Sequence, residues 1–194
     1  KNNVAGTFNL EKDASLVLSA AKTTQDAKQH TLSAKVSGIG AIHMISAADS
    51  QPYSQTLVQS ITSDLSKFTG DILTYNGGTP VLLEIVNQSS LPADPPPQDI
   101  SYIVVTNGAT LQINNNWTSP TNRIWILGNS GVPTINIPAG RNVTITGPVI
   151  GSVGFKKTGL GTLTIVGDQP NFSGDVETLS LIHISEPTRR RGIS

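Results

Sequence analysis

The chain has 194 residues, 13 basic and 13 acidic side chains, no cysteine, and only 13% charged residues. An average globular domain carries about 25% charged residues, so this composition excludes a charged disordered tail and a basic nucleic-acid-binding domain. No run approaches the roughly 18 apolar residues that a membrane-spanning helix needs. The 18 glycines, the 12 prolines and the many small polar residues are typical of short β-strands joined by turns.

In the N-terminal half, short aliphatic runs bounded by turn residues predict a series of β-strands. These runs cover residues 15–18, 31–36, 41–45, 71–75 and 81–86. Residues 57–68 are ambiguous, because the spacing of their apolar residues also fits one face of a helix. Polar Thr62, Ser63 and Asp64 interrupt that face, so the favoured interpretation is a strand followed by a turn.

A proline-rich segment, residues 91–99, follows the last of these runs. Its four prolines cannot donate backbone hydrogen bonds and favour an extended loop. The segment therefore predicts a loop or linker between an N-terminal portion, residues 1–90, and a C-terminal portion, residues 100–178. One continuous stack with a protruding loop fits the same pattern.

In the C-terminal portion, a unit of two aliphatic residues separated by one other residue recurs. It is found at residues 111–113, 124–126, 135–137, 143–145 and 163–165. Alternation puts the two aliphatic residues on one face of a strand and the middle residue on the other. This pattern predicts Trp125 on the outer face, where Trp125 and Trp117 are candidate residues for contact with a sugar or another partner. The alternative is that Trp125 packs against Trp117 beneath a neighbouring loop or outer strand.

Two sequence blocks recur in the same order. Residues 37–44 align with residues 158–165, and residues 68–72 align with residues 172–176. Each copy of the first block contains two glycines separated by one residue, which allow a sharp corner before a strand. A single unit of this kind cannot bury its apolar face alone, so the repetition predicts stacked coils, that is, an all-β solenoid.

Residues 156–176 resemble the autotransporter-associated β-strand repeat of bacterial passenger domains. The residues that fall on the repeat pattern are Lys157, Gly159, Gly161, Leu163, Ile165, Gly167, Phe172, Ser173 and Gly174. The earlier copy departs from the pattern, because Val36 stands where the lysine would be. The resemblance implies a right-handed parallel β-helix with irregular loops, displayed at the bacterial cell surface or released outside the cell. It also implies an outer-membrane β-barrel translocator in the same full-length chain.

The final residues, 179–194, resemble the product of an adapter and not a natural sequence. Residues 179–189 correspond residue for residue to one translated frame of the transposase-end adapter used in shotgun DNA libraries. We therefore expect a non-native tail that makes few contacts with the body, and we assign no nucleic-acid partner to the arginines at 189–191. A native strand over residues 179–184 followed by a basic tail is the alternative.

The titratable residues predict neither a catalytic site nor a metal site. Cleavage of a glycosidic bond needs two carboxyl groups about 5 to 9.5 Å apart. The acidic residues considered are sparse and lie mostly at expected turns: Asp71, Glu84, Asp94, Asp99, Asp168 and Asp175. His30 and His43 have no second ligand at a metal-binding spacing. We expect no cofactor.

These observations favour a non-enzymatic fragment of a surface-displayed or secreted passenger, with a role in structural display or adhesion. Its expected partners are glycans or proteins on host or neighbouring cell surfaces. The absence of cysteine suits passage through an oxidising periplasm. Two alternatives stay open: a carbohydrate-active β-helix enzyme, and a passive spacer in a long secreted protein.

Overall fold

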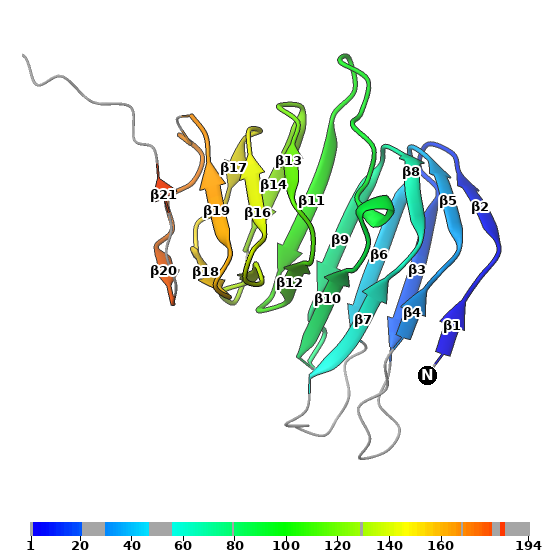
Figure 1. The fold of residues 1–194 in the computed structure, drawn as a ribbon, viewed down its shortest axis with the longest axis horizontal. Coiled ribbons are helices and arrows are strands. Elements are labelled where there is room, and N and C mark those ends of the chain that lie inside the picture. The colour runs from blue at the N-terminus through cyan, green and yellow to red at the C-terminus, as the bar shows by residue number, and fades with distance from the viewer. Residues whose placement is uncertain are drawn as a thin grey trace, which may run out of the picture.

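The computed structural model describes residues 2–20, 30–46, 56–78, 80–128, 130–167, 169–179 and 183–184. Over these residues the chain is largely parallel β-strand and is coiled into a β-solenoid, which confirms the predicted fold class (Figure 1). Strands of successive coils pair side by side, and the solenoid has three sides.

The first side is sheet A, which runs the length of the stack and contains 8 strands. In order along the sheet they are β1 (Asn2–Val4), β4 (His30–Leu32), β7 (Leu57–Ile61), β10 (Val81–Ile85), β12 (Thr110–Ile113), β15 (Thr134–Asn136), β18 (Phe155–Thr158) and β20 (Val176–Thr178). Neighbouring strands are parallel and in register, so equivalent side chains stack in rows along the solenoid axis.

The second side is divided into two sheets, and the third side is one sheet. Sheet B contains β2 (Thr7–Leu10), β5 (Lys35–Gly38) and β8 (Asp64–Phe68). Sheet D contains β13 (Trp117–Ser119), β16 (Asn142–Ile145), β19 (Thr162–Ile165) and β21 (His183–Ile184). Sheet C, the third side, contains β3 (Ser15–Ala20), β6 (Ala41–Ser46), β9 (Asp71–Tyr75), β11 (Ser101–Thr106), β14 (Arg123–Leu127) and β17 (Val149–Ile150).

The proline-rich segment lies between sheets B and D. A short 3-10 helix, η1 (Gln88–Ser90), leads into it, and residues 91–99 then run without strand pairing to β11 (Figure 1, green loop at the top). Sheets A and C continue past this segment through the pairs β10–β12 and β9–β11. Residues 1–90 and 100–178 therefore contribute to one continuous stack, which is one of the two arrangements that fit the sequence.

The core is a column of inward-pointing side chains enclosed by the sheets. In β10, Val81, Leu83 and Ile85 are buried, whereas the residues between them are partly exposed. One cluster of buried apolar residues extends from Leu10 to Leu163. Because each Å² of apolar surface removed from water contributes about 25 cal/mol, this column is the main source of cohesion between coils.

The strands differ from the sequence expectations in several places, of which three are instructive. Residues 57–68 form two strands, β7 and β8, so the helical alternative is wrong. Residues 31–36 contribute to two strands of different sheets, β4 and β5, because Ser33 and Ala34 form the corner between them. The sequence pattern predicts no strand over β11, although β11 pairs with strands on both of its edges.

The two copies of the first recurring block mark the same kind of corner at different places in the coil. Gly38 and Gly40 lie at a corner from sheet B to sheet C, whereas Gly159 and Gly161 lie at a corner from sheet A to sheet D. A Cβ at Gly40 or Gly161 would lie 2.4 or 2.3 Å from a backbone oxygen of the preceding coil. Stacked coils are therefore present, but the two copies of this block do not occupy equivalent positions in the solenoid.

Candidate functional site

Trp125 and Trp117, the predicted contact residues, lie in the core. Trp125 is fully buried, and its indole Nε1 donates a hydrogen bond of 2.9 Å to Ser119 Oγ. The ring centroids of Trp125 and Trp117 are 5.6 Å apart. The prediction that Trp125 points outward is wrong, whereas the alternative contact with Trp117 is confirmed.

The strand that carries Trp125 has apolar residues on both faces, and this is why alternation is misleading there. Ile124 and Ile126 are only partly buried and point outward, whereas Arg123, Trp125 and Leu127 are buried. Burial of the larger indole removes more apolar surface from water than burial of an isoleucine side chain. The inward position of Trp125 is therefore the more favourable arrangement.

Lys157, one of the residues in 156–176 that resemble the autotransporter-associated repeat, is buried and closes the corner that follows it. Its Nζ donates to the backbone oxygen of Gly159 at 2.6 Å and also to that of Gly161. Burial lowers the pKa of the Lys157 amino group below its ordinary value. Gly159 has a φ of +76°, which a residue with a Cβ rarely adopts. These three residues therefore shape a corner of the solenoid.

The other residues of the repeat pattern lie around the C-terminal end of the core. Leu163 is fully buried, and Ile165 and Phe172 are partly buried against the apolar cluster. The Phe172 ring lies 5.8 Å from that of Phe155. The three small residues of the pattern lie between strands: Gly167, Ser173 and Gly174.

Among the acidic residues identified from the sequence, Asp71 has the most altered environment. It is partly buried, and burial raises the pKa of its carboxyl group. The Tyr102 N–H, which donates to Asp71 Oδ1 at 2.8 Å, opposes this shift, as do the nearby Arg123 and His43. Three of the other acids, Asp94, Asp99 and Asp175, are exposed, and Asp168 lies outside the described residues. Over the described ranges, no three His, Cys, Asp or Glu side chains gather as a metal site requires.

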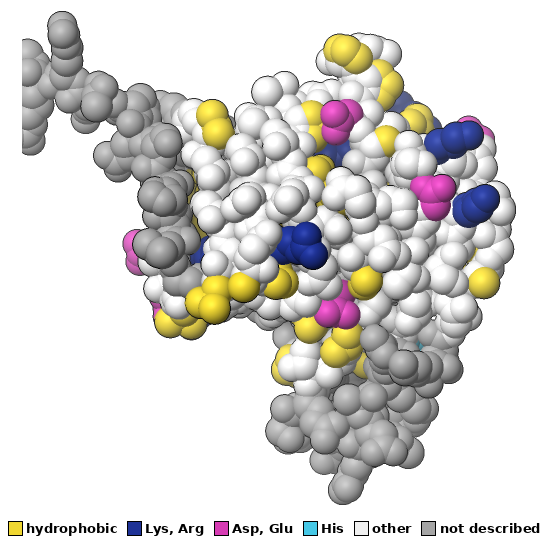
Figure 2. Space-filling view, viewed as in Figure 1, with side chains coloured by type: hydrophobic (Ala, Val, Ile, Leu, Met, Phe, Trp, Pro, Cys, Tyr) yellow, Lys and Arg dark blue, Asp and Glu magenta, His cyan; other side chains and the backbone are white. Residues whose placement is uncertain are grey.

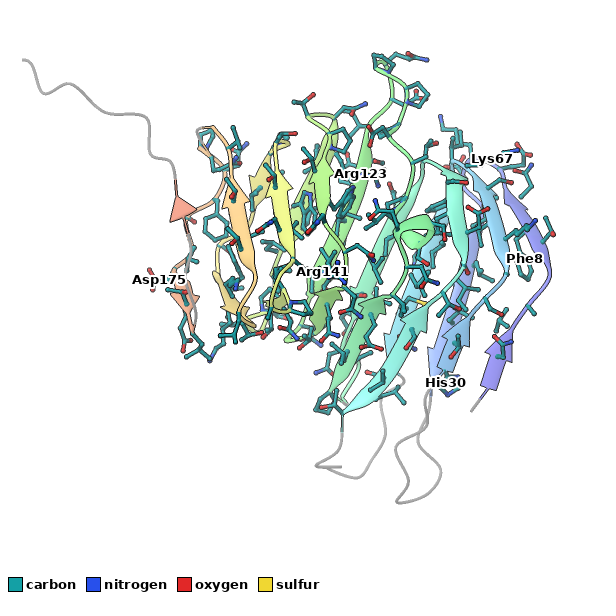
Figure 3. All side chains as sticks on the ribbon, viewed as in Figure 1. Phe8, His30, Lys67, Arg123, Arg141 and Asp175 are labelled. Carbon is teal, nitrogen blue, oxygen red and sulfur yellow. The ribbon has the colours of Figure 1, made fainter. Side chains whose placement is uncertain are left out.

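Arg123 is a buried cation that no sequence motif indicates, and it points into the core in Figure 3. Its Nη1 donates to Gly70 O at 3.4 Å, and its Nη2 donates to Ala93 O at 2.6 Å. The guanidinium carbon also lies 5.9 Å from the Trp117 ring centroid. Burial lowers the pKa of Arg123 to about 10, against the opposing effect of two nearby aspartates. Because Ala93 belongs to the proline-rich segment, Arg123 ties that segment to the core.

The outer face of sheet C carries a continuous row of mostly apolar side chains, which we call the sheet C stripe. Strand by strand, register pairs join Val17, His43, Leu73, Val104, Ile126 and Ile150. Val17 is 49% exposed and the others are partly exposed. Tyr75, on the same face, is 47% exposed. At about 4.8 Å between strands, the stripe is roughly 24 Å long.

The outer face of sheet A is polar, and its side chains bond to one another. Ser60 Oγ donates to Glu84 Oε2 at 2.9 Å, and Gln112 Nε2 donates to Glu84 Oε1 at 2.8 Å. Asn136 Nδ2 then donates to Gln112 Oε1 at 2.6 Å. Glu84, one of the acids considered from the sequence, is therefore the acceptor at the centre of a structural row.

Part of the predicted tail lies within the described residues. The Leu179 N–H donates to Lys157 O at 3.1 Å, and β21 pairs with β19. The remaining tail residues, 180–182 and 185–194, lie outside the described residues.

In comparisons with known proteins, no family model, no curated protein and no solved structure matches the chain. Where the structure describes the chain, no helix is long and apolar enough to cross a membrane. The β-solenoid and the chemistry of its outer faces are therefore the basis for a functional proposal.

Proposed function

We propose that the chain is part of a bacterial surface-displayed or secreted autotransporter-type passenger, and that it acts in adhesion through the sheet C stripe. The observation that carries the proposal is the stripe itself, in which His43 is the only polar member. The passenger-type repeat at 156–176 supports export as part of a longer chain with an outer-membrane β-barrel translocator. The expected partners of the chain are glycans or proteins on host or neighbouring cells.

The stripe supports an adhesive role in preference to that of a passive spacer. Side chains on the outside of a solenoid add little to its core, and contiguous exposed apolar patches commonly mark interaction surfaces. β-Strands favour β-branched residues, and threonine meets this preference with a polar side chain. Outward positions on sheet D are filled in this way, by the row Thr118, Thr144 and Thr164. A spacer would have no need for aliphatic residues at the equivalent positions of sheet C.

Attachment of beads coated with the full chain to epithelial cells and to bacteria tests the proposal. The variant Val104→Lys/Ile126→Lys places two charges in the middle of the stripe. The matched control, Thr144→Lys/Thr164→Lys, places two charges on the outer face of sheet D. We expect the stripe variant to reduce attachment at least about fivefold and the control to stay within about twofold of the original chain.

Circular dichroism would check that both variants keep their β-structure. Equal attachment by both variants would contradict the role of the stripe, and no attachment by the original chain would favour the spacer. Release of reducing sugar from pectin or glucan, abolished by Asp71→Asn, would favour the carbohydrate-active enzyme.

A further inference from the structure

A groove of about 260 Å³ lies on the outer face of sheet B. Its polar lining residues are Thr7, Lys35, Ser37, Asp64, Ser66 and Lys67. They come from three neighbouring strands, β2, β5 and β8. The groove is therefore on a different side of the solenoid from the sheet C stripe.

An irregularity in β8 turns two adjacent side chains toward the groove. β5 and β8 pair at Lys35–Asp64 and at Ser37–Lys67, so β8 has one more residue than β5 between these two pairs. A β-bulge of this kind interrupts the alternation of side chains, and such bulges are frequent beside functional sites because they re-aim side chains. Ser66 and Lys67 are consequently both exposed on the outer face.

The groove has an excess of positive charge. Figure 2 shows basic side chains next to an acidic side chain over β5 and β8, and Figure 3 labels Lys67 in this region. Asp64 Oδ1 accepts hydrogen bonds from Ser66 Oγ at 2.6 Å and from Ser66 N at 3.0 Å. These bonds, with a smaller contribution from Lys35 and Lys67, lower the pKa of the Asp64 carboxyl group. Asp64 is thus a carboxylate at neutral pH, and one of its oxygens is already occupied.

The two lysines keep capacity for an anionic ligand. In the part of the chain that the structure describes, neither Lys35 nor Lys67 has an acidic oxygen within the 4.0 Å of an ion pair. The ammonium group of lysine is a compact charge with three donors, suited to a carboxylate or a sulfate. Two cations and one anion give the lining a net charge of +1 at neutral pH.

The hydroxyl groups that line the groove and the volume of the groove narrow the class of ligand. Thr7, Ser37 and Ser66 line the groove, and a hydroxyl group both donates and accepts hydrogen bonds, as the hydroxyls of a sugar require. Ser37 Oγ lies 3.1 Å from Asn9 Oδ1, to which it donates, and its lone pairs remain able to accept. At about 30 Å³ for each water molecule, the volume equals that of about nine waters, which is room for one sugar ring.

We propose that this groove binds one acidic sugar residue, carboxylated or sulfated, within a surface polysaccharide. Lys35 and Lys67 face the anionic group, and the hydroxyls of Thr7 and Ser37 face those of the sugar. The proposal goes beyond adhesion through the sheet C stripe. Because the two surfaces lie on different sides, either one can fail its test while the other passes.

Isothermal titration calorimetry with the full chain tests the ligand class. The probes are oligosaccharides of equal length: one from sulfated dextran, which carries sulfate and no carboxylate, one from polygalacturonate, which is carboxylated, and one from dextran, which is neutral. We expect at least one acidic probe to bind, the neutral probe not to bind, and the affinity to fall as the NaCl concentration rises from about 0.05 to about 0.5 M. The acidic probe that binds more tightly distinguishes sulfate from carboxylate.

Variants of the lining assign the binding to the groove. Lys35→Gln/Lys67→Gln is expected to weaken binding by roughly tenfold, whereas Lys156→Gln on sheet A should leave it unchanged. Asp64→Asn is expected to tighten binding by about two- to threefold, because it removes a negative charge beside the ligand. A gain in affinity cannot arise from loss of folding.

Any of the following outcomes would overturn the proposal: equal binding of the neutral probe, no binding of either acidic probe, or unchanged affinity in the double lysine variant. Weaker binding by Asp64→Asn would overturn it as well. The stripe variant Val104→Lys/Ile126→Lys should keep the affinity for the acidic probe, which separates this site from the adhesive surface.

Discussion

At the scale of single residues, two buried cations are accommodated by backbone carbonyl groups. Arg123 donates to Gly70 O and Ala93 O beside the proline-rich segment, and Lys157 donates to the corner at Gly159 and Gly161. A buried charge without such partners costs several kcal/mol. Each cation therefore stabilises a place where the regular pairing of strands is interrupted.

Lys157→Met tests this role, because it keeps the length of the side chain and removes the donor. Loss of the hydrogen bonds from the charged group should lower the free energy of unfolding by about 1.5 to 3 kcal/mol, measured by chemical denaturation. The control is Lys156→Met, whose lysine is partly exposed and lies 3.0 Å from Glu177. The control should change stability by less than about 1 kcal/mol. Unchanged or increased stability of Lys157→Met would show that the lysine does not hold the corner.

Trp125→Ala should act on stability and not on binding. The indole is fully buried, so its removal should cost about 3 to 5 kcal/mol in thermal or chemical unfolding. Ile126→Ala, at the next position on the outer face, should cost less than about 1 kcal/mol. Similar costs for the two variants would place Trp125 on the surface.

Asp64 should make the stability of the fold depend on pH in the acidic range. Its pKa in the folded chain lies below the unfolded value of 3.8, so its ionised form favours folding above that pH, and this contribution is lost as the pH falls through the lowered pKa. Ser66→Ala removes one of the two bonds responsible and should raise the Asp64 pKa toward 3.8 in an NMR titration. Ser37→Ala on the neighbouring strand should leave it unaltered. An unchanged pKa in Ser66→Ala would contradict the hydrogen bond as the cause.

At the scale of elements, the proline-rich segment is fixed to the body at both ends. The Ala93 N–H donates to Phe68 O at 2.9 Å, and Arg123 donates to the carbonyl oxygen of Ala93. Farther along, Asn122 Nδ2 lies within hydrogen-bond distance of Pro95 O, Pro96 O and Asp99 O, at 3.2, 2.9 and 2.9 Å. The consecutive residues Asn122 and Arg123 thus hold the segment in the place where sheet B ends.

Asn122→Ala should release only the second half of this segment. Hydrogen–deuterium exchange of the Asp99 amide should accelerate by roughly tenfold, whereas that of Ala93, which keeps its own bonds, should not change. Asn115→Ala is the control, because it removes a side-chain bond of 3.1 Å to Val86 O elsewhere on the solenoid. Equal exchange of Asp99 in both variants would mean that Asn122 does not anchor the segment.

The sequence pattern correctly predicts which residues are buried in strands that have only one apolar face. In β12, Leu111 and Ile113 are buried as alternation predicts, because the residue between them, Gln112, is polar. The pattern fails in β14, where the stripe makes the outer face apolar as well, so that two isoleucines compete with Trp125 for the core. Arg123 and the groove of sheet B depend on contacts between coils, which no local pattern encodes.

At the scale of the whole molecule, one solenoid presents three chemically different sides. The outer face of sheet A is a bonded polar row, that of sheet C is the apolar stripe, and that of sheet B carries a basic groove. This division depends on one in-register stack, because each row is built from strands of successive coils. The proline-rich segment is the point at which the stack would break if the two portions were separate units.

Formation of a disulfide across that point is the most direct test of the continuous stack. The chain has no cysteine, and Leu82 and Thr110 are register partners in sheet A on opposite sides of the proline-rich segment. Parallel neighbours about 4.8 Å apart fall within the span of a disulfide. Mild oxidation of Leu82→Cys/Thr110→Cys should therefore give an intramolecular crosslink, detected by mass spectrometry. Leu82→Cys/Thr134→Cys, two strands apart, should not crosslink, and equal crosslinking of both pairs or none in the first would contradict the continuous in-register solenoid.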